Sequence, residues 1–288
     1  MAVRTKAEKI LKKVVLWSGF LLVTLIILAP FAWLFISSVA SQADLLAKPL
    51  KFWPEHVDFS RYVRIFSGDA GDETAYTFYR AMFNSARIAL TVTVISLTAG
   101  SLAAYAFTRM QGNFKDKLLY LLIYTYMLPP IAIIIPMFLI MSKLGLLDTI
   151  YSLIIVYSSF ITPFVVWLMR GFLATLPVEL EEAAMVDGLT RMQAFFRVIL
   201  PLAVPGLVAT GIFAFLMAWD EFMYALIFTS SIDAKTISVA IAEFSGKNAV
   251  DYGMIAAGGV LAALPPVILA LVFQKYIISG LTSGSVKG

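Results

Sequence analysis

The sequence predicts an all-α membrane protein that crosses the bilayer with six helices. The first observation is composition: of 288 residues, 60% are hydrophobic and only 14% are charged, against about 45–50% apolar and about 25% charged in an average soluble domain. The second is that the apolar residues gather in long runs, and about 20 apolar residues suffice to cross the hydrocarbon core. Because lipid offers no partner for a free backbone amide, each crossing is expected to be helical.

The expected spans occupy six separate runs within a single transmembrane domain, residues 1–288. In chain order they are residues 14–39, 83–108, 118–141, 151–174, 200–229 and 254–278. Prolines lie inside or near the ends of several runs, including the pairs Pro129-Pro130 and Pro265-Pro266. Each proline removes a helix hydrogen bond, so the spans are expected to be kinked.

The first run has an alternative interpretation as a cleaved signal peptide, because a basic stretch precedes it and small residues follow it. However, the run is too long for such a peptide and contains Trp17, Pro30 and Trp33. We therefore expect it to remain in the protein as the first span.

The positive charges predict the orientation. If the amino terminus is inside, the inner segments carry 13 Lys and Arg residues and the outer segments carry 8. Most of the outer charges lie in the long loop between the first two spans, which counts for less, and an excess of Lys and Arg marks the cytoplasmic side. Both termini and the loop at 175–199 are therefore expected to be cytoplasmic.

Several kinds of site are excluded or unexpected. The chain has no cysteine and a single histidine, His56, which excludes disulfides and thiolate metal sites and speaks against a histidine metal site. The sequence also lacks the Gly-x-x-x-x-Gly-Lys-Ser/Thr loop that cradles ATP phosphates. We therefore expect no catalytic site, cofactor or metal in this chain. Energy for any transport would come from a partner or from an ion gradient.

The loop at 175–199 contains a carboxylate-rich stretch between two apolar runs. It reads Glu182-Ala183-Ala184, three further residues, Gly188, nine further residues, and then Val198-Ile199-Leu200-Pro201. Glutamates suit the positive end of a short helix, and Gly188 can take the left-handed conformation that ends one. The alanines leave a face without bulk, which a partner surface can approach closely. Taken alone, this is also the pattern of an ordinary amphipathic surface helix.

This spacing resembles the signature cytoplasmic loop of permease subunits in bacterial ABC importers, which is Glu-Ala-Ala, Gly and then Ile-x-Leu-Pro; here Val198 stands at the Ile position. The resemblance extends over essentially the whole chain. It implies the type I importer architecture, in which a cytoplasmic coupling helix docks onto a separate ATPase that binds ATP and magnesium. The residues that it assigns to coupling are Glu179, Glu182, Ala183, Ala184, Asp187, Gly188, Leu200 and Pro201.

Two further segments resemble the carbohydrate branch of these importers: Trp219-Asp220-Glu221-Phe222 in the fifth expected span, and the tail at 280–288. An oligosaccharide or related polyol is therefore the expected substrate, and Trp219, Asp220 and Glu221 are candidates for its path. Ionisable groups within spans are costly and usually face a cavity or a partner. The alternative is that the two acids pair with Arg87 or lie close to the outer interface.

The loop between the last two expected spans, residues 230–252, is the segment that can enter an external binding protein in this family. The candidate contacts with that protein are the small polar residues at its tip: Ser245, Gly246, Lys247 and Asn248. The alternative is a plain solvated turn.

Together these features predict a transmembrane subunit of an ATP-binding-cassette importer in the cytoplasmic (inner) membrane of a bacterium. The resemblance implies four partners: a second permease subunit, expected to be a different chain, two ATPase subunits and an external substrate-binding protein. No nucleic acid is expected. The main alternative is an ion-coupled secondary transporter, which should show repeat symmetry and buried acids. Asp220 and Glu221 leave room for that alternative, whereas the signature loop argues against it.

Overall fold

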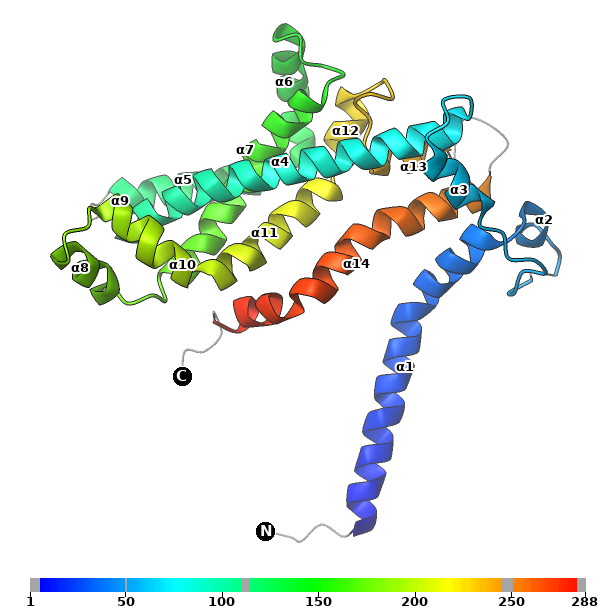
Figure 1. Ribbon diagram of the computed structural model, residues 1–288, viewed down its shortest axis with the longest axis horizontal. Helices are drawn as coiled ribbons and strands as arrows, with labels where there is room; N and C mark the ends of the chain where they lie inside the picture. The colour runs from blue at the N-terminus through cyan, green and yellow to red at the C-terminus, as the bar shows by residue number, and fades with distance from the viewer. Residues whose placement is uncertain (1–5, 50, 110–113, 245–250, 284–288) are drawn as a thin grey trace.

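A computed structural model describes residues 6–49, 51–109, 114–244 and 251–283. Within these residues the regular structure is entirely helical (Figure 1), so the all-α prediction is confirmed. In the part of the chain that the structure describes, four helices contain stretches long and apolar enough to cross a membrane. They are α1 (Lys6–Val39), α4 (Glu73–Arg109), α7 (Ile150–Leu173) and α14 (Tyr252–Ser283).

The two other expected spans are broken. Helices α5 (Phe114–Met127) and α6 (Pro130–Lys143) are bent by 89° at their junction, because Pro129 and Pro130 interrupt the helical hydrogen bonds there. The fifth expected span is interrupted twice, by a bend of 78° before α11 (Val204–Trp219) and by a break after it. Six spans are therefore present only if each bent pair counts as one span.

Helix α4 is longer than expected, since it starts ten residues before position 83. Its 37 residues correspond to about 55 Å at a rise of 1.5 Å per residue, which exceeds the roughly 30 Å hydrocarbon core. The extra turns are amphipathic and bury Ala75, Phe78 and Ala81. Charged Glu73 and Arg80 lie in the same turns. Because they interrupt the apolar run, the run itself does not indicate this part of the helix.

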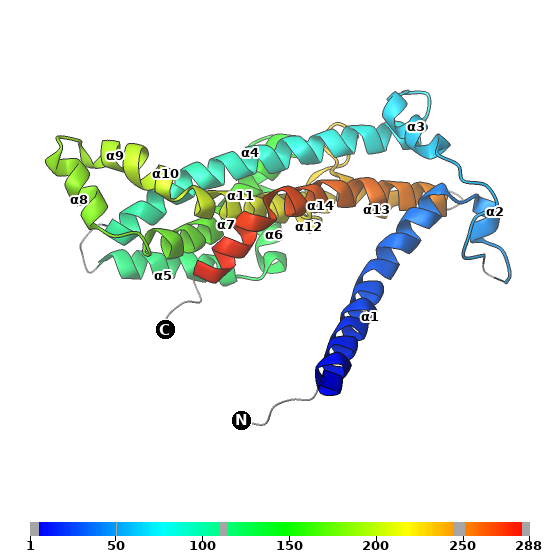
Figure 2. The same ribbon diagram turned by 60° about the horizontal axis from the view of Figure 1, so that its bottom comes forward.

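The core is formed where α4 packs against α7 and α11 (Figures 1 and 2). Small residues allow this close approach, as is usual between membrane helices. A Cβ atom added at Gly100 would lie 2.5 Å from a methyl carbon of Val165, and one added at Gly206 would lie 2.4 Å from Cγ of the Phe172 ring. The three packed helices form the frame from which the loops at both ends of α4 project.

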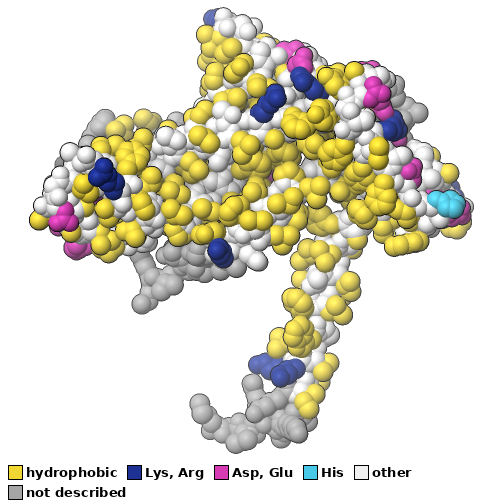
Figure 3. Space-filling view, viewed as in Figure 1, with side chains coloured by type: hydrophobic (Ala, Val, Ile, Leu, Met, Phe, Trp, Pro, Cys, Tyr) yellow, Lys and Arg dark blue, Asp and Glu magenta, His cyan; other side chains and the backbone are white. Residues whose placement is uncertain are grey.

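Helix α1 lies largely apart from this frame. It meets α14 near its own carboxyl end and diverges from it toward the amino terminus in both views (Figures 1 and 2). Apolar side chains cover its exposed length (Figure 3). Such a surface suits lipid or another membrane chain rather than water.

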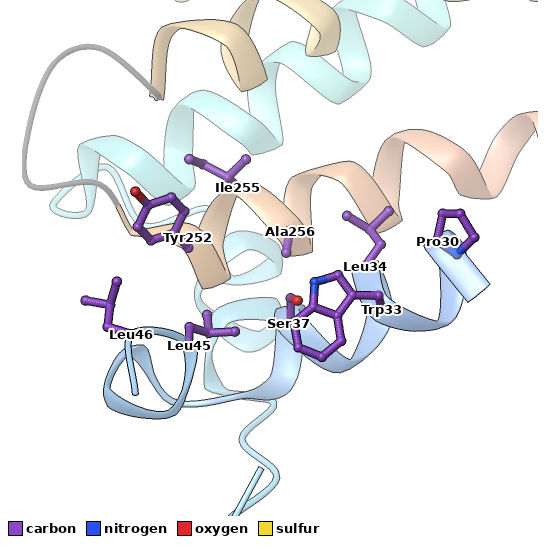
Figure 4. A pocket seen from close by; sticks show the side chains of 9 residues that line it. All are labelled: Pro30, Trp33, Leu34, Ser37, Leu45, Leu46, Tyr252, Ile255 and Ala256. Carbon is purple, nitrogen blue, oxygen red and sulfur yellow. The ribbon is translucent and has the colours of Figure 1, made fainter. Parts of the chain in front are cut away.

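An apolar hollow of about 490 Å³ lies between α1, α2 (Gln42–Leu45) and the first turns of α14 (Figure 4). Trp33 and Leu34 from α1 face Tyr252 and Ile255 from α14 across it. Ser37, the Tyr252 hydroxyl and the Trp33 indole N–H are its polar side-chain groups. The lining is therefore predominantly apolar and aromatic.

Candidate coupling site and substrate path

The signature loop forms a short helix, a turn and a second helix. Helix α8 (Glu179–Val186) starts just after Pro177, with three glutamates in its first turn. It ends at Gly188, which has the left-handed conformation predicted from the sequence, with φ at +92°. The N–H of Gly188 donates to Met185 O at 3.1 Å, and the N–H of Leu189 donates to Ala184 O at 3.1 Å. This pair of hydrogen bonds satisfies the last carbonyls of the helix.

The chain then re-enters the membrane through a continuous but irregular helix. Helix α9 (Arg191–Ala194) begins with a capping box between Thr190 and Gln193, which satisfies two free amides at once. A π-helical turn, η1 (Phe195–Ile199), and α10 (Leu200–Leu202) follow. The π-turn precedes Pro201, whose missing N–H cannot bond the preceding turn. Leu200 and Pro201 therefore lie where the helix changes form, away from the exposed face of α8.

Helix α8 has two distinct faces. Glu182, Ala183 and Asp187 are exposed together with Val186, whose side chain is 87% exposed. Most of the predicted coupling residues are thus displayed at the surface, at one end of the molecule (Figure 1). Ala184 is the exception among the motif residues, since it is buried against the rest of the chain.

The buried face also holds Glu181, a residue that the sequence interpretation did not select. Its side chain is only 3% exposed. Tyr105 donates its hydroxyl hydrogen to Glu181 Oε1 at 2.5 Å, Arg109 Nε lies 3.2 Å from Oε2, and Arg191 Nε lies 3.6 Å from Oε1. We call these four residues the Glu181 cluster. Tyr105 and Arg109 lie more than 70 positions away along the chain, so only the fold brings them to α8.

Comparison with known proteins identifies the chain. Residues 96–283 match the family described as "binding-protein-dependent transport system inner membrane component". This segment contains the whole signature loop. The chain belongs to this family.

Individual relatives match over almost their full length. The trehalose/maltose transport system permease protein MalG of Thermococcus litoralis is 37% identical over 98% of this chain and 99% of its own. The trehalose transport system permease protein SugB of Mycobacterium tuberculosis is 38% identical over 91% of this chain and 93% of its own. A bacterial ABC transporter involved in the import of alginate gives a TM-score of 0.80 at 23% identity, over 96% of this chain and 99% of that one. This last likeness shows that the two chains share a fold.

In this permease the candidate Trp219 is buried between α11 and α14. Its indole N–H donates to Ala262 O at 3.0 Å. That carbonyl has no helical partner because the residue four positions later, Pro266, has no N–H. The ring also stacks on Phe215, with centroids 5.6 Å apart. This structure therefore gives Trp219 a packing role beside the proline pair of α14, and its place on a substrate path stays a prediction.

Asp220 and Glu221 lie at the break between α11 and α12 (Met223–Phe228). Both carboxylate oxygens of Glu221 accept backbone hydrogen bonds, from Tyr224 N at 3.0 Å and Ala225 N at 3.2 Å. Glu221 thus satisfies the free amides at the start of α12. Asp220 is exposed. Among the residues that the structure describes, neither acid forms an ion pair with Arg87.

The two broken spans meet beside Glu221. Tyr224 stacks on Phe160 of α7, with ring centroids 5.8 Å apart, and its hydroxyl donates to Pro130 O at 3.4 Å. Pro130 is the first residue after the break between α5 and α6. Backbone that departs from helix within a membrane is tolerated where protein buries it or where it lines a water-filled cavity.

The loop at 229–236 is held against the amino-terminal part of α4. The side-chain amide of Asn84 donates to Ile232 O at 3.2 Å and to Lys235 O at 3.0 Å, and Ser85 Oγ accepts from Ile237 N at 2.9 Å. Helix α13 (Ile237–Phe244) then packs against α4. The four predicted tip residues, Ser245 to Asn248, lie outside the described residues, so their contacts stay a prediction.

A second set of hydrogen bonds holds the same loop, from Asp148 in the turn between α6 and α7. Asp148 Oδ1 accepts hydrogen bonds from the N–H groups of Ser230 and Ser231, both at 2.8 Å. Burial opposes the charged form, yet the N–H groups of Ser231 and Ser230 hold the pKa of Asp148 below its ordinary value. The Asp148 N–H in turn donates to Phe228 O at 2.8 Å. The loop at 229–236 is therefore held on two sides.

Proposed function

We propose that this permease moves a carbohydrate, with a different permease subunit beside it, two ATPase subunits on the cytoplasmic side and a substrate-binding protein outside. The observation that carries this proposal is α8, a short helix that is anchored by one face and presents acidic, small and apolar side chains on the other. The family membership supports an importer fed by a binding protein. The relatives give no support to an ion-coupled carrier.

The names of the relatives support the carbohydrate substrate. MalG of Thermococcus litoralis and SugB of Mycobacterium tuberculosis are named for trehalose or maltose. A relative from Agrobacterium fabrum, 35% identical over 91% of this chain, is named for sulfoquinovosyl glycerol. These substrates share several hydroxyl groups and a sugar ring, which is the chemistry that we propose for the solute moved by this chain.

In this proposal the chain hydrolyses nothing itself. It has no loop of the kind that cradles ATP phosphates, so ATP and magnesium would be held by the two ATPase subunits. These subunits close on ATP and move α8, and the membrane helices then open the path alternately to each side. The paired breaks near Pro130 and Glu221 supply non-helical backbone that can rearrange without melting a complete span.

Glu182 is the residue that we assign to docking. It is exposed in the first turn of α8 beside the small Ala183, so a basic group on an ATPase can reach it. A charge-assisted hydrogen bond of this kind is stronger and more directional than one between neutral groups. Gly188 shapes the end of the same helix, because residues other than glycine are strained at its positive φ.

Uptake of radiolabelled maltose and trehalose by cells that contain the complete importer tests the proposal. Glu182→Lys places repulsion where we propose attraction, so ATPase co-purification and sugar uptake should both fall while the chain still reaches the membrane. Glu55→Lys makes the same change of charge at an exposed position in the loop after α2, and it should leave uptake intact. Wild-type uptake by Glu182→Lys would contradict the docking role of α8.

The orientation can be tested separately, because the chain has no native cysteine. We propose that both termini and α8 are cytoplasmic. A cysteine in place of exposed Val186 should then react only with membrane-permeant reagents, whereas one in place of Asp233, whose side chain is 77% exposed, should react from outside. The reverse pattern would overturn the orientation and leave the family membership untouched.

A further inference from the structure

The Glu181 cluster lies behind the surface that we propose for ATPase docking. Glu181 and Glu182 are neighbours in sequence, yet one is buried and the other is exposed. Substitutions at the two positions therefore perturb different surfaces of the same short helix. Glu181 faces the membrane part of the chain, and no docking partner can contact it without displacing α8.

The cluster connects three parts of the chain. Tyr105 and Arg109 both belong to the last two turns of α4, and Arg191 is the first residue of α9. Arg109 also donates from Nη2 to Leu176 O at 2.8 Å. The end of α4 therefore holds the segment that leads into α8 as well as α8 itself.

Burial makes this connection difficult to break. The side chains of Glu181 and Arg109 are 3% and 7% exposed. A buried ion that loses its partner keeps the cost of having left water, so separation of such a pair is strongly unfavourable. The ring of Tyr105 also packs on Phe195 of η1, with centroids 4.6 Å apart. Movement of α8 away from α4 would break these contacts together.

We propose that Glu181 is a positioning residue that joins α8 to the carboxyl-terminal end of α4, so that movement of α8 is passed into the membrane helices. Glu181 touches neither sugar nor ATPase in this role. It acts through Arg109 and Tyr105, which lie on the helix at the centre of the core. This proposal rests on the proposed function, because it takes α8 as the site that receives the ATPase movement.

The test measures docking and coupling separately in the complete importer in lipid vesicles. Glu181→Gln keeps the shape of the side chain and removes its charge. We expect the ATPase subunits to co-purify with this variant as they do with wild type. Substitutions along a coupling route typically change coupling by about 2- to 30-fold. The amount of maltose or trehalose imported per ATP hydrolysed should therefore decrease by a factor in that range.

Two milder variants keep the test decisive if Glu181→Gln does not reach the membrane. Tyr105→Phe removes one hydrogen bond and keeps the packing against Phe195, and Glu181→Asp keeps the charge on a shorter side chain. Tyr105→Phe should lower the coupling ratio, and Glu181→Asp should recover part of the loss seen with Glu181→Gln. A wild-type ratio in both Tyr105→Phe and Glu181→Gln would overturn the proposal. If Glu181→Gln does not reach the membrane, a wild-type ratio in Tyr105→Phe alone would overturn it. Loss of ATPase co-purification in Glu181→Gln would also overturn it, because Glu181 would then only shape the docking helix.

A distance measurement tests directly whether the Glu181 cluster keeps α8 fixed to the end of α4. Spin labels on Leu180→Cys and Val94→Cys report the separation of α8 from the exposed side of α4, since both positions are exposed and neither belongs to the face that we assign to docking. In an otherwise wild-type chain the distance should stay the same with and without ATP, and Glu181→Gln should make it change or broaden. An equal ATP-dependent change with and without Glu181 would refute a rigid joint. If the wild-type complex hydrolyses ATP without any response to sugar and binding protein, the proposed function itself fails.

Discussion

The two ends of α4 are held by different kinds of contact. At its carboxyl-terminal end, side chains of α4 meet side chains of α8 and α9 in the buried Glu181 cluster. At its amino-terminal end, Asn84 and Ser85 bond the backbone of the loop that precedes α13. The first attachment is ionic and concentrated on one buried carboxylate. The second consists mainly of neutral hydrogen bonds, with one exposed ion pair between Arg80 and Asp233 beside them.

The partner at each end explains the difference. Helix α8 satisfies its own backbone groups within the helix and in the turn at Gly188, so α4 can hold it only through side chains. The segment at 229–236 is irregular, and its backbone groups need partners from elsewhere, because buried backbone polar groups are almost always paired. Asn84, Ser85 and Asp148 supply those partners. Helix α8, a regular element, is thus held to α4 by an ion pair between side chains. The irregular segment at 229–236 is held by hydrogen bonds to its backbone.

The largest effect is expected at the ionic end. Arg109→Ala removes the buried partner of Glu181 and the donor to Leu176 O, and breaking a buried pair costs about 3–5 kcal/mol. Thermal unfolding of the purified chain in detergent should show this loss. Arg191→Ala removes a partner of the same carboxylate whose side chain is 55% exposed, so its cost should be far smaller. Equal losses would mean that the cluster is held by net charge rather than by burial.

An intermediate effect is expected at the hydrogen-bonded end. Asn84→Ala leaves the carbonyls of Ile232 and Lys235 without their donor, and an unsatisfied buried group costs about 1–3 kcal/mol. Hydrogen exchange should accelerate across residues 229–237 while residues 179–188 stay protected. Thr98→Ala is the control on the same helix, because Thr98 is exposed and bonds only the α4 backbone at Val94 O. Faster exchange at both ends of α4 would show that the two attachments are not independent.

A smaller, pH-dependent effect is expected at Asp148. Its pKa in the folded chain lies below its ordinary value, so its carboxylate stabilises the fold above that ordinary value, about 3.9. This stability is lost as the pH falls through the lower, folded pKa. Asp148→Asn should cost about 1 kcal/mol near pH 7, the difference between a charged and a neutral acceptor.

Asparagine is the suitable replacement because Asp148 has a φ of +58°, a conformation that Asn tolerates well. The comparison to make is the difference in unfolding temperature between wild type and Asp148→Asn, followed from pH 7 down to pH 3. That difference should shrink on acidification, since protonation makes the wild type resemble the variant. A constant difference would show that the charge of Asp148 contributes nothing to the loop.

The sequence predicted features that depend on neighbours in the chain. The apolar runs, the short helix at α8 and the left-handed Gly188 follow from local composition and spacing, and the structure contains all three. The break after Trp219 is not among the expected features, because Asp220 and Glu221 are interpreted from the sequence as membrane charges and not as the residues that end one helix and start the next. The signal is the pair of carboxylates itself, since acids favour the positive, amino-terminal end of a helix.

The partners of Glu181 and Trp219 could not be predicted for a different reason. Glu181 meets Arg109 across 72 positions of the chain, and Trp219 meets Ala262 across 43. Pairs so far apart depend on how the helices pack. Pro266 identifies Ala262 as a carbonyl without a helical partner, yet nothing in the sequence says that Trp219 will supply one. The sequence can show that a backbone carbonyl lacks its helical partner, and only the fold shows which side chain bonds to it.

The smallest effect is expected from the ion pair between Arg80 and Asp233, which also links α4 to the loop at 229–236. The Asp233 side chain is 77% exposed, so water and salt weaken the attraction, and such pairs contribute about 0–1 kcal/mol. Asp233→Asn should therefore change the unfolding temperature little, and 1 M salt should remove what remains, because charges are screened within about 3 Å there. Asn84→Ala should keep its full effect in the same salt, since the groups that it leaves unpaired are neutral. If Asp233→Asn proves as costly as Asn84→Ala, or if the loss from Asn84→Ala fades with salt, both ends of α4 are held by charge. The distinction between an ionic attachment at α8 and a neutral, hydrogen-bonded attachment at 229–236 would then be wrong.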